Sequence, residues 1–139
     1  MTRSTKRNVV LGMVMLLMTA AACGDDAGAD PARFCEINTE IDRLGDPFEL
    51  PPDEARDMVQ TGRDLLDESI KVAPDEIRSS VEIEVASFDP FFDLFEAAGF
   101  DVTQIDDAEI EAMFETVFSG ENEAAFDVVE AWVDANCST

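Results

Sequence analysis

The sequence predicts an all-α fold, an antiparallel four-helix bundle with one extra short capping helix. Apolar residues recur at spacings of three and four in five segments, which is the periodicity of amphipathic helices. No segment shows an alternating pattern that a strand would explain better than a helix. A cysteine near each end of the domain restricts how the helices can be arranged, since a disulfide would join the first helix to the last.

The first two helices have clear start signals. The first is expected to begin after Asp30, which can cap it in front of Pro31, and to end at Gly45. The second is expected from about 52 to 72. Gly62 falls on the apolar face of this second helix. It predicts the close approach of another helix, because a mid-helix glycine otherwise costs about 1 kcal/mol.

The third helix is expected to begin at Pro74 and to end at Gly99, with Pro90 inside it. A proline in a helix interior removes a backbone donor and clashes with the preceding turn. The helix must therefore kink near Ala86, or break so that Asp89 caps a restarted segment. Both alternatives fit the sequence.

The fourth helix has the best local start signal in the chain. Asp106 can cap it, and Glu109 lies at its third position, which together resemble a capping box. Gly120 is expected to end this helix. The fifth helix is expected from about 122 to 136.

The first 22 residues differ in kind from the rest. Three basic residues precede an apolar run of 14 residues, from Val9 to Ala22. A positive start, a short apolar run and a small-residue cleavage site are typical of a secretory signal peptide. The run is shorter than the roughly 20 residues that span a bilayer.

Ala20, Ala21 and Ala22 end this run and Cys23 follows directly. The segment resembles the lipobox of bacterial lipoproteins, with Ala20 in place of the usual Leu. The resemblance implies that the Cys23 sulfur is lipidated, that residues 1–22 are cleaved, and that two acyl chains hold the protein firmly on a membrane. The alternatives are an ordinary signal peptide and an uncleaved helix.

The expected mature protein is small and strongly acidic. Residues 23–29 would form a lipid-anchored acidic tether, and residues 30–139 a single helical domain. All 32 acidic residues but only six of the nine basic ones follow position 22, so the mature charge is −26. This charge disfavours nucleic acid and favours cationic partners such as a basic protein or a divalent ion. The expected location is the outer face of the cytoplasmic membrane.

Two cysteines remain once Cys23 is assigned to the anchor. In an oxidising location Cys35 and Cys137 are expected to form a disulfide, with two free thiols as the alternative. The bridge requires the start of the first helix to meet the end of the last, so these helices should run antiparallel. Five equal helices in simple order would make them parallel. A short fourth helix that crosses the top of a four-helix bundle removes the conflict.

The mature segment also resembles small helical lipoproteins of high-GC Gram-positive bacteria. The resemblance is carried by the lipobox, by Phe34-Cys35, by the turn sequence APDEI at 73–77, and by Cys137 near the end. It implies an all-helical fold and an address outside the cell. It implies little about activity.

The residue types argue against an enzyme. The chain has no histidine and no tyrosine, and its seven glycines form no phosphate-binding loop. We therefore expect no catalytic residue, no cofactor and no metal. Calcium is the strongest metal candidate, but the EF-hand pattern is absent and caps of a helix start explain the acidic cluster more simply. That cluster contains Asp101, Asp106, Asp107, Glu109 and Glu111.

Two functions fit these observations. The first is a non-catalytic binding or interaction module whose acidic surface takes cationic partners. The second is a carrier that holds a small apolar ligand or lipid in a Phe-lined pocket between helices. Phenylalanines at helical spacing form a core more often than a ligand site. The group consists of Phe88, Phe91, Phe92, Phe95, Phe100, Phe114 and Phe118.

Overall fold

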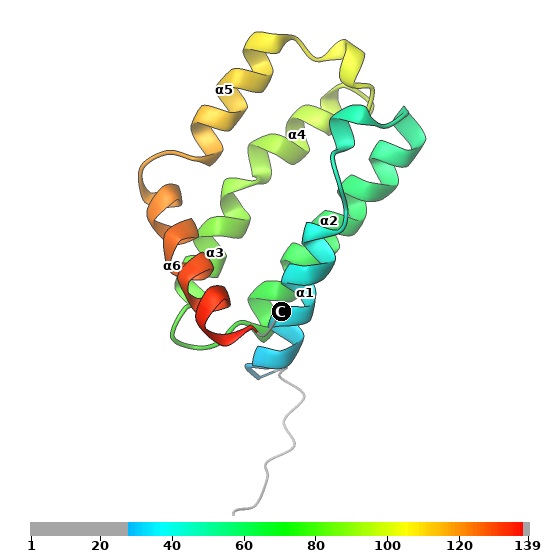
Figure 1. Cartoon of the computed structure of the whole chain (residues 1–139). Coiled ribbons are helices and arrows are strands. Elements are labelled where there is room, and N and C mark those ends of the chain that lie inside the picture. The colour runs from blue at the N-terminus through cyan, green and yellow to red at the C-terminus, as the bar shows by residue number, and fades with distance from the viewer. Residues whose placement is uncertain (1–27, 138–139) are drawn as a thin grey trace, which may run out of the picture.

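The computed structural model describes residues 28–137, and these residues contain helices and no strand (Figure 1). The predictions for residues 1–22 and for Cys23 lie outside the described residues. The predicted all-α class is confirmed. The elements are α1 (Pro31–Asp42), η1 (Pro47–Glu49), α2 (Pro52–Val72), α3 (Arg78–Ser87), α4 (Asp89–Ala97), η2 (Val102–Gln104), α5 (Asp107–Val117) and α6 (Glu121–Asn136), where η marks a 3-10 turn.

The two predicted side-chain caps are confirmed. The Asp30 carboxylate accepts a hydrogen bond from the backbone N–H of Arg33 at 3.0 Å. The Asp106 carboxylate accepts one from the backbone N–H of Ala108 at 2.8 Å, and Glu109 accepts one from the N–H of Asp106 at 3.1 Å. These bonds satisfy N–H groups that have no partner within the helix.

The predicted helix 74–99 breaks at Phe88. This residue ends α3 and precedes α4, so Pro90 lies in the first turn of α4, where no backbone donor is needed. Asp89 was expected to cap the restarted helix, which is wrong, because Asp89 is already its first helical residue.

The predicted start of the third helix at Pro74 is also wrong. Residues 74–77 form a turn, and the helix begins at Arg78. The Arg78 guanidinium donates to the carbonyls of Ile70 at 3.0 Å and Ala73 at 2.8 Å. It therefore satisfies carbonyls at the end of α2 while the chain reverses.

The expected helix ends at Gly45 and Gly120 lie slightly too late. The helices already stop at Asp42 and Val117. After α1 the N–H of Leu44 donates to the carbonyl of Ile41, a tighter turn that ends the α-helical pattern. Gly45 and Gly120 follow with φ of +87° and +56°, a region that glycine enters without strain.

The chain folds so that segments distant in sequence pack together. α1 packs on α2, α2 on α3, α3 on α6, and α4 on α5, with α3 and α4 between the α1–α2 pair and the α5–α6 pair (Figure 1). The larger core cluster draws on α1, α2, α3 and α6. It consists of Phe34, Ile37, Leu65, Val72, Ala73, Ile77, Val81 and Val129.

A second core cluster is rich in phenylalanine. Its buried members are Val59, Phe92, Phe95 and Ile105. Phe88, Phe91 and Phe100 pack against it, so the core interpretation of these residues is confirmed. That interpretation is wrong for Phe114 and Phe118, which are 43% and 51% exposed. Phe114 lies in the last turns of α5 and Phe118 directly follows the helix, and their stacked rings lie 6.1 Å apart.

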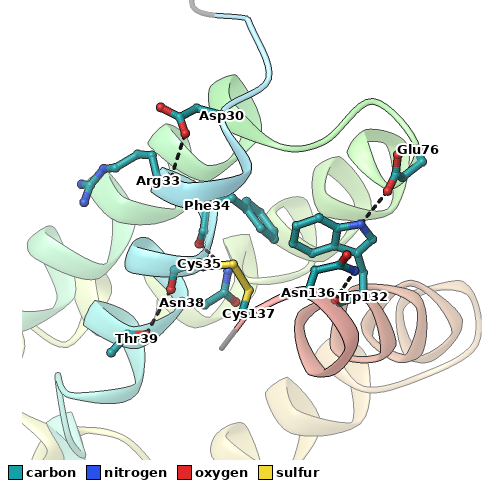
Figure 2. Close-up of a disulfide and its surroundings, with 10 residues drawn as sticks. All are labelled: Asp30, Arg33, Phe34, Cys35, Asn38, Thr39, Glu76, Trp132, Asn136 and Cys137. Atoms are coloured by element: carbon teal, nitrogen blue, oxygen red, sulfur yellow. Dashed lines mark hydrogen bonds between the residues drawn. A yellow bond between two sulfur atoms is a disulfide. The ribbon is translucent and has the colours of Figure 1, made fainter. Parts of the chain in front are cut away.

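The predicted disulfide between Cys35 and Cys137 is confirmed, with Cα atoms 5.4 Å apart (Figure 2). It joins the first turns of α1 to the residue after α6. Beside it the Trp132 ring meets Phe34 edge-on at 5.6 Å, and the indole N–H donates to Glu76 at 2.7 Å. Covalent and apolar contacts thus hold the same end of the molecule.

Candidate functional site

A cavity of about 340 Å³ lies between α1, α2 and α3. Phe34, Asn38 and Ile41 of α1 face it at spacings of four and three. α2 contributes residues at the same helical spacing, and α4, α6 and the segment 44–47 add to the wall. The lining residues from α2 include Met58, Val59, Gly62, Leu66 and Ser69, and those from the other elements include Val81, Glu84, Val85, Phe88, Phe91, Phe92 and Val129.

Gly62 opens the cavity on the α2 side. Its expected role was to admit another helix closely, and this is wrong. A Cβ at this position would meet only the side chain of Leu44, whose Cδ1 lies 3.4 Å away, and no helix backbone. The missing side chain leaves space that becomes part of the cavity.

Three phenylalanines form an aromatic wall of the cavity. The ring of Phe91 lies 6.5 Å from that of Phe88 and 5.5 Å from that of Phe92, both in edge-on contacts. Adjacent helical residues point about 100° apart, yet Phe91 and Phe92 both line the cavity. Because α4 begins directly after the break at Phe88, both residues lie at its start, beside the cavity.

Two of the polar side chains in the wall form hydrogen bonds within their own helices. The Ser69 hydroxyl donates to the carbonyl of Leu66 at 2.6 Å. The Asn38 amide donates to the carbonyl of Phe34 at 2.9 Å. Both bonds are internal to a helix, so neither group requires a ligand.

Glu84 differs from these groups. Its side chain is half-buried in the wall, and burial raises the pKa of its carboxyl to about 7. In residues 28–137 no arginine or lysine forms an ion pair with Glu84. No polar side-chain atom in this range is both fully buried and unpaired, so the carboxyl group retains some access to solvent.

Sequence reasoning missed Glu84, although a signal was present. Val81, Val85 and Phe88 repeat at helical spacing, and Glu84 lies on the same face as Val81 and Phe88. A carboxylate within an apolar stripe must either find a partner or be desolvated. Such a residue is a candidate for function when it also lines a cavity.

The acidic cluster at 101–111 is explained largely by capping. Asp101 accepts hydrogen bonds from the N–H and hydroxyl of Thr103, and these bonds lower the pKa of its carboxyl. Asp106 and Glu109 form the capping box described above. Within the described part of the chain, no group of three or more acidic or cysteine side chains is arranged to hold a metal ion.

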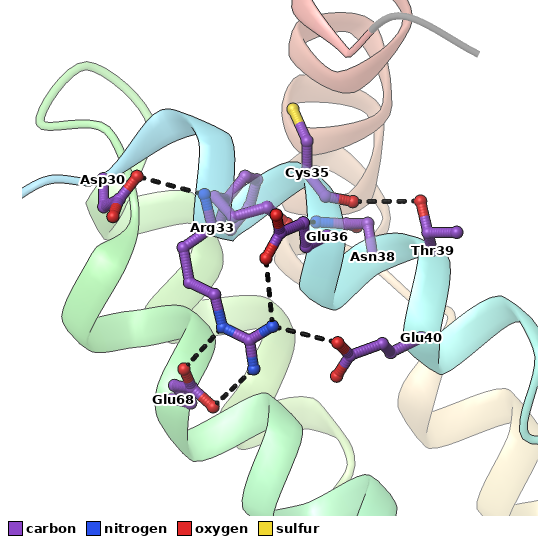
Figure 3. A network of polar contacts seen from close by, with 9 residues as sticks. Asp30, Arg33, Cys35, Glu36, Asn38, Thr39, Glu40 and Glu68 are labelled. Atoms are coloured by element: carbon purple, nitrogen blue, oxygen red, sulfur yellow. Dashed lines mark hydrogen bonds and ion pairs between the residues drawn. The ribbon is translucent and has the colours of Figure 1, made fainter.

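Arg33 forms a second polar cluster, which links two helices (Figure 3). Its guanidinium binds Glu68 of α2 through two hydrogen bonds of 2.7 and 3.0 Å and Glu40 of α1 at 2.9 Å. The hydrogen bonds from Arg33 lower the pKa of Glu68. The cluster therefore tethers α1 to α2 through charge-assisted hydrogen bonds, which gives it a structural role.

No helix among residues 28–137 is long and apolar enough to span a membrane. No protein-family model, curated protein or solved structure matches the chain. The cavity, its desolvated carboxyl group and the strong negative charge are therefore the observations that bear on function.

Proposed function

We propose that this domain is a non-catalytic binding protein that holds a small, largely apolar ligand in the cavity between α1, α2 and α3. The single observation that carries the proposal is the cavity itself. Its volume of about 340 Å³ falls within the roughly 300–1,000 Å³ of small-molecule sites, which are mostly apolar with few polar groups. Phe34, Val81 and Phe92, which line it, belong to the two core clusters, so the site is built into the fold.

The proposal includes the arrangement of the helices as an antiparallel four-helix bundle with a short capping helix. The link between the first turns of α1 and the end of α6 supports it, as do the contacts of α1 with α2 and of α3 with α6. Ligand sites of bundles lie between facing helices. A ligand that buries five methylene groups there would gain about 4 kcal/mol before the costs of binding are subtracted.

We also propose that lipid on Cys23 anchors the domain to the outer face of the cytoplasmic membrane. The basic start, the apolar run and the small residues before Cys23 support this address. Mass spectrometry of protein extracted from membranes is expected to show a chain that begins at Cys23 and carries a diacylglycerol. An unmodified Cys23 in that material would contradict the anchor and leave the cavity unaffected.

The ligand site is tested by filling the cavity. Gly62→Leu places a side chain in the open space of α2 and replaces a poor helix former with a good one, so the protein should fold. We expect the full chain to bind the neutral apolar dye N-phenyl-1-naphthylamine saturably, at one site. Gly62→Leu should weaken this binding by about tenfold or more, because the added side chain occupies volume that the dye needs. Dye fluorescence measures both affinities.

Thr61→Leu is the matched control. Thr61 is exposed on the same helix and next to Gly62, so this variant adds the same apolar side chain outside the cavity. It should bind the dye like the unaltered protein. Equal affinities of Gly62→Leu and Thr61→Leu, or no saturable binding by the unaltered chain, would overturn the proposal.

A further inference from the structure

We propose that the ligand of this cavity is a hydrophobic organic cation, whose ammonium group pairs with the Glu84 carboxylate while its hydrocarbon part lies against the aromatic wall. The inference rests on the proposed function, because it names the class of ligand for that same site.

The position of Glu84 is the first argument. Of the polar side chains in the wall, Ser69 and Asn38 bond to their own helices, whereas Glu84 has no cation paired with it in the described residues. An ionised carboxylate in an apolar surrounding is costly unless a positive group accompanies it. A bound ammonium group would supply the missing partner through a charge-assisted hydrogen bond.

The surroundings of Glu84 offer no internal substitute for that partner. The lining residues that face the cavity from α2, α4 and α6 are all uncharged, and α1 adds Asp42, which is exposed and negative. Both ionisable groups that line the cavity are therefore acidic. Burial already raises the pKa of Glu84 to about 7, so a cation next to it would lower that pKa and favour the charged form.

The aromatic wall suits the same ligand. Phe88 follows Glu84 by four residues on one helical face, so a ring and a carboxylate are neighbours at the cavity. Cations are attracted to the faces of aromatic rings. Outside the cavity, the guanidinium of Arg63 lies 4.5 Å from the centre of the Phe92 ring, an example of such a contact in this protein.

The charge of the whole domain points the same way. The net charge of the full chain is −23. A field of this sign raises the local concentration of cations and repels anionic amphiphiles such as fatty acids. Negatively charged apolar ligands are thus disfavoured before they reach the cavity.

Two probes of equal size and opposite character test the inference. 4-Phenylbutylamine is a cation at neutral pH, and 4-phenylbutan-1-ol is its neutral counterpart. Isothermal titration calorimetry at pH 8 should show that the full chain binds the amine at least about tenfold more tightly, the effect of one charge-assisted hydrogen bond. Glu84→Gln should remove most of this preference, since the amide carries no charge to pair with the ammonium group.

Glu82→Gln is the matched control, because it removes the same charge from an exposed position of α3. It should retain the preference for the amine.

The pH dependence of binding is a second test, because a purely structural role of Glu84 would not produce it. The affinity of the unaltered chain for the amine should rise by about tenfold from pH 5.5 to 8 as Glu84 ionises, whereas the affinity for the alcohol should not.

The possible failures are distinguishable. If both probes bind and Glu84→Gln leaves the amine preference intact, the proposed cation class is wrong and the apolar site stands. If Glu82→Gln loses the amine preference as much as Glu84→Gln does, the preference comes from the general surface charge, and the proposed role of Glu84 is overturned. If neither probe binds the unaltered chain, the proposed function itself fails.

Discussion

Removal of the disulfide, by Cys35→Ala together with Cys137→Ala, is expected to lower the free energy of unfolding by about 4–5 kcal/mol. The bridge spans 102 positions of sequence, and in the chain-entropy model the stabilisation grows with the length of the closed loop. Small domains are stable by only about 5–15 kcal/mol in total. The double variant should therefore lose a substantial fraction of its stability, which urea titration followed by helical circular dichroism would measure.

Reduction of the unaltered protein gives an independent version of this experiment. Its urea midpoint under reducing conditions should fall to that of the double variant, which itself should not respond to reductant. The Thr39 hydroxyl donates to the backbone carbonyl of Cys35, a group that the alanine variant retains. A loss below about 1 kcal/mol would show that apolar contacts such as Phe34 with Trp132 already fix the two ends of the domain.

The starts of α1 and α5 and the disulfide were predictable because residue type and order identify them. Asp30 and Asp106 each precede a helix at a spacing where a carboxylate reaches free N–H groups, so sequence order alone identifies them. Cys35 and Cys137 were the only pair left in the expected mature domain once Cys23 was assigned to the anchor. Such features need no knowledge of what packs against them.

The start of α3 and the cavity were not predictable in the same way. Pro74 has the residue type of a helix start, but Arg78 reaches back to carbonyls at the end of α2, and this tertiary contact favours a turn over 74–77. Pro90 fits either a kink or a break, and the local rules for proline do not choose between them. The cavity combines residues from α1, α2, α3, α4 and α6, so no single stretch of sequence encodes it.

Glu84→Gln is expected to stabilise the folded protein at pH 8 by about 3 kcal/mol and to have little effect at pH 4. Burial raises the pKa of Glu84 from its usual 4.5 to about 7. Below pH 4.5 the carboxyl is protonated in both the folded and the unfolded chain, so it imposes no cost. Between these values the unfolded chain ionises first, and stability is lost until the folded carboxyl has also ionised above pH 7.

Urea titration of both proteins at pH 4 and pH 8 measures this difference. The many exposed carboxylates also make total stability depend on pH, so the comparison must be between variants at each pH. Glu82→Gln, on the exposed face of α3, should change stability by no more than about 0.5 kcal/mol at either pH. A Glu84→Gln effect of equal size at both pH values would contradict the assigned burial of the carboxyl.

A ligand gives the same experiment a second outcome. At pH 8 the unpaired Glu84 carboxylate lowers the stability of the unaltered protein. A cation that pairs with Glu84 binds only the folded state, and such binding adds to stability. Saturating 4-phenylbutylamine should therefore reduce the difference in the free energy of unfolding between the unaltered protein and Glu84→Gln at pH 8. In contrast, 4-phenylbutan-1-ol should stabilise both proteins alike. A carboxylate that only fills space would respond equally to both compounds. A positively charged ligand that pairs with Glu84 removes the free-energy cost of the unpaired carboxylate, and the site therefore favours such a ligand.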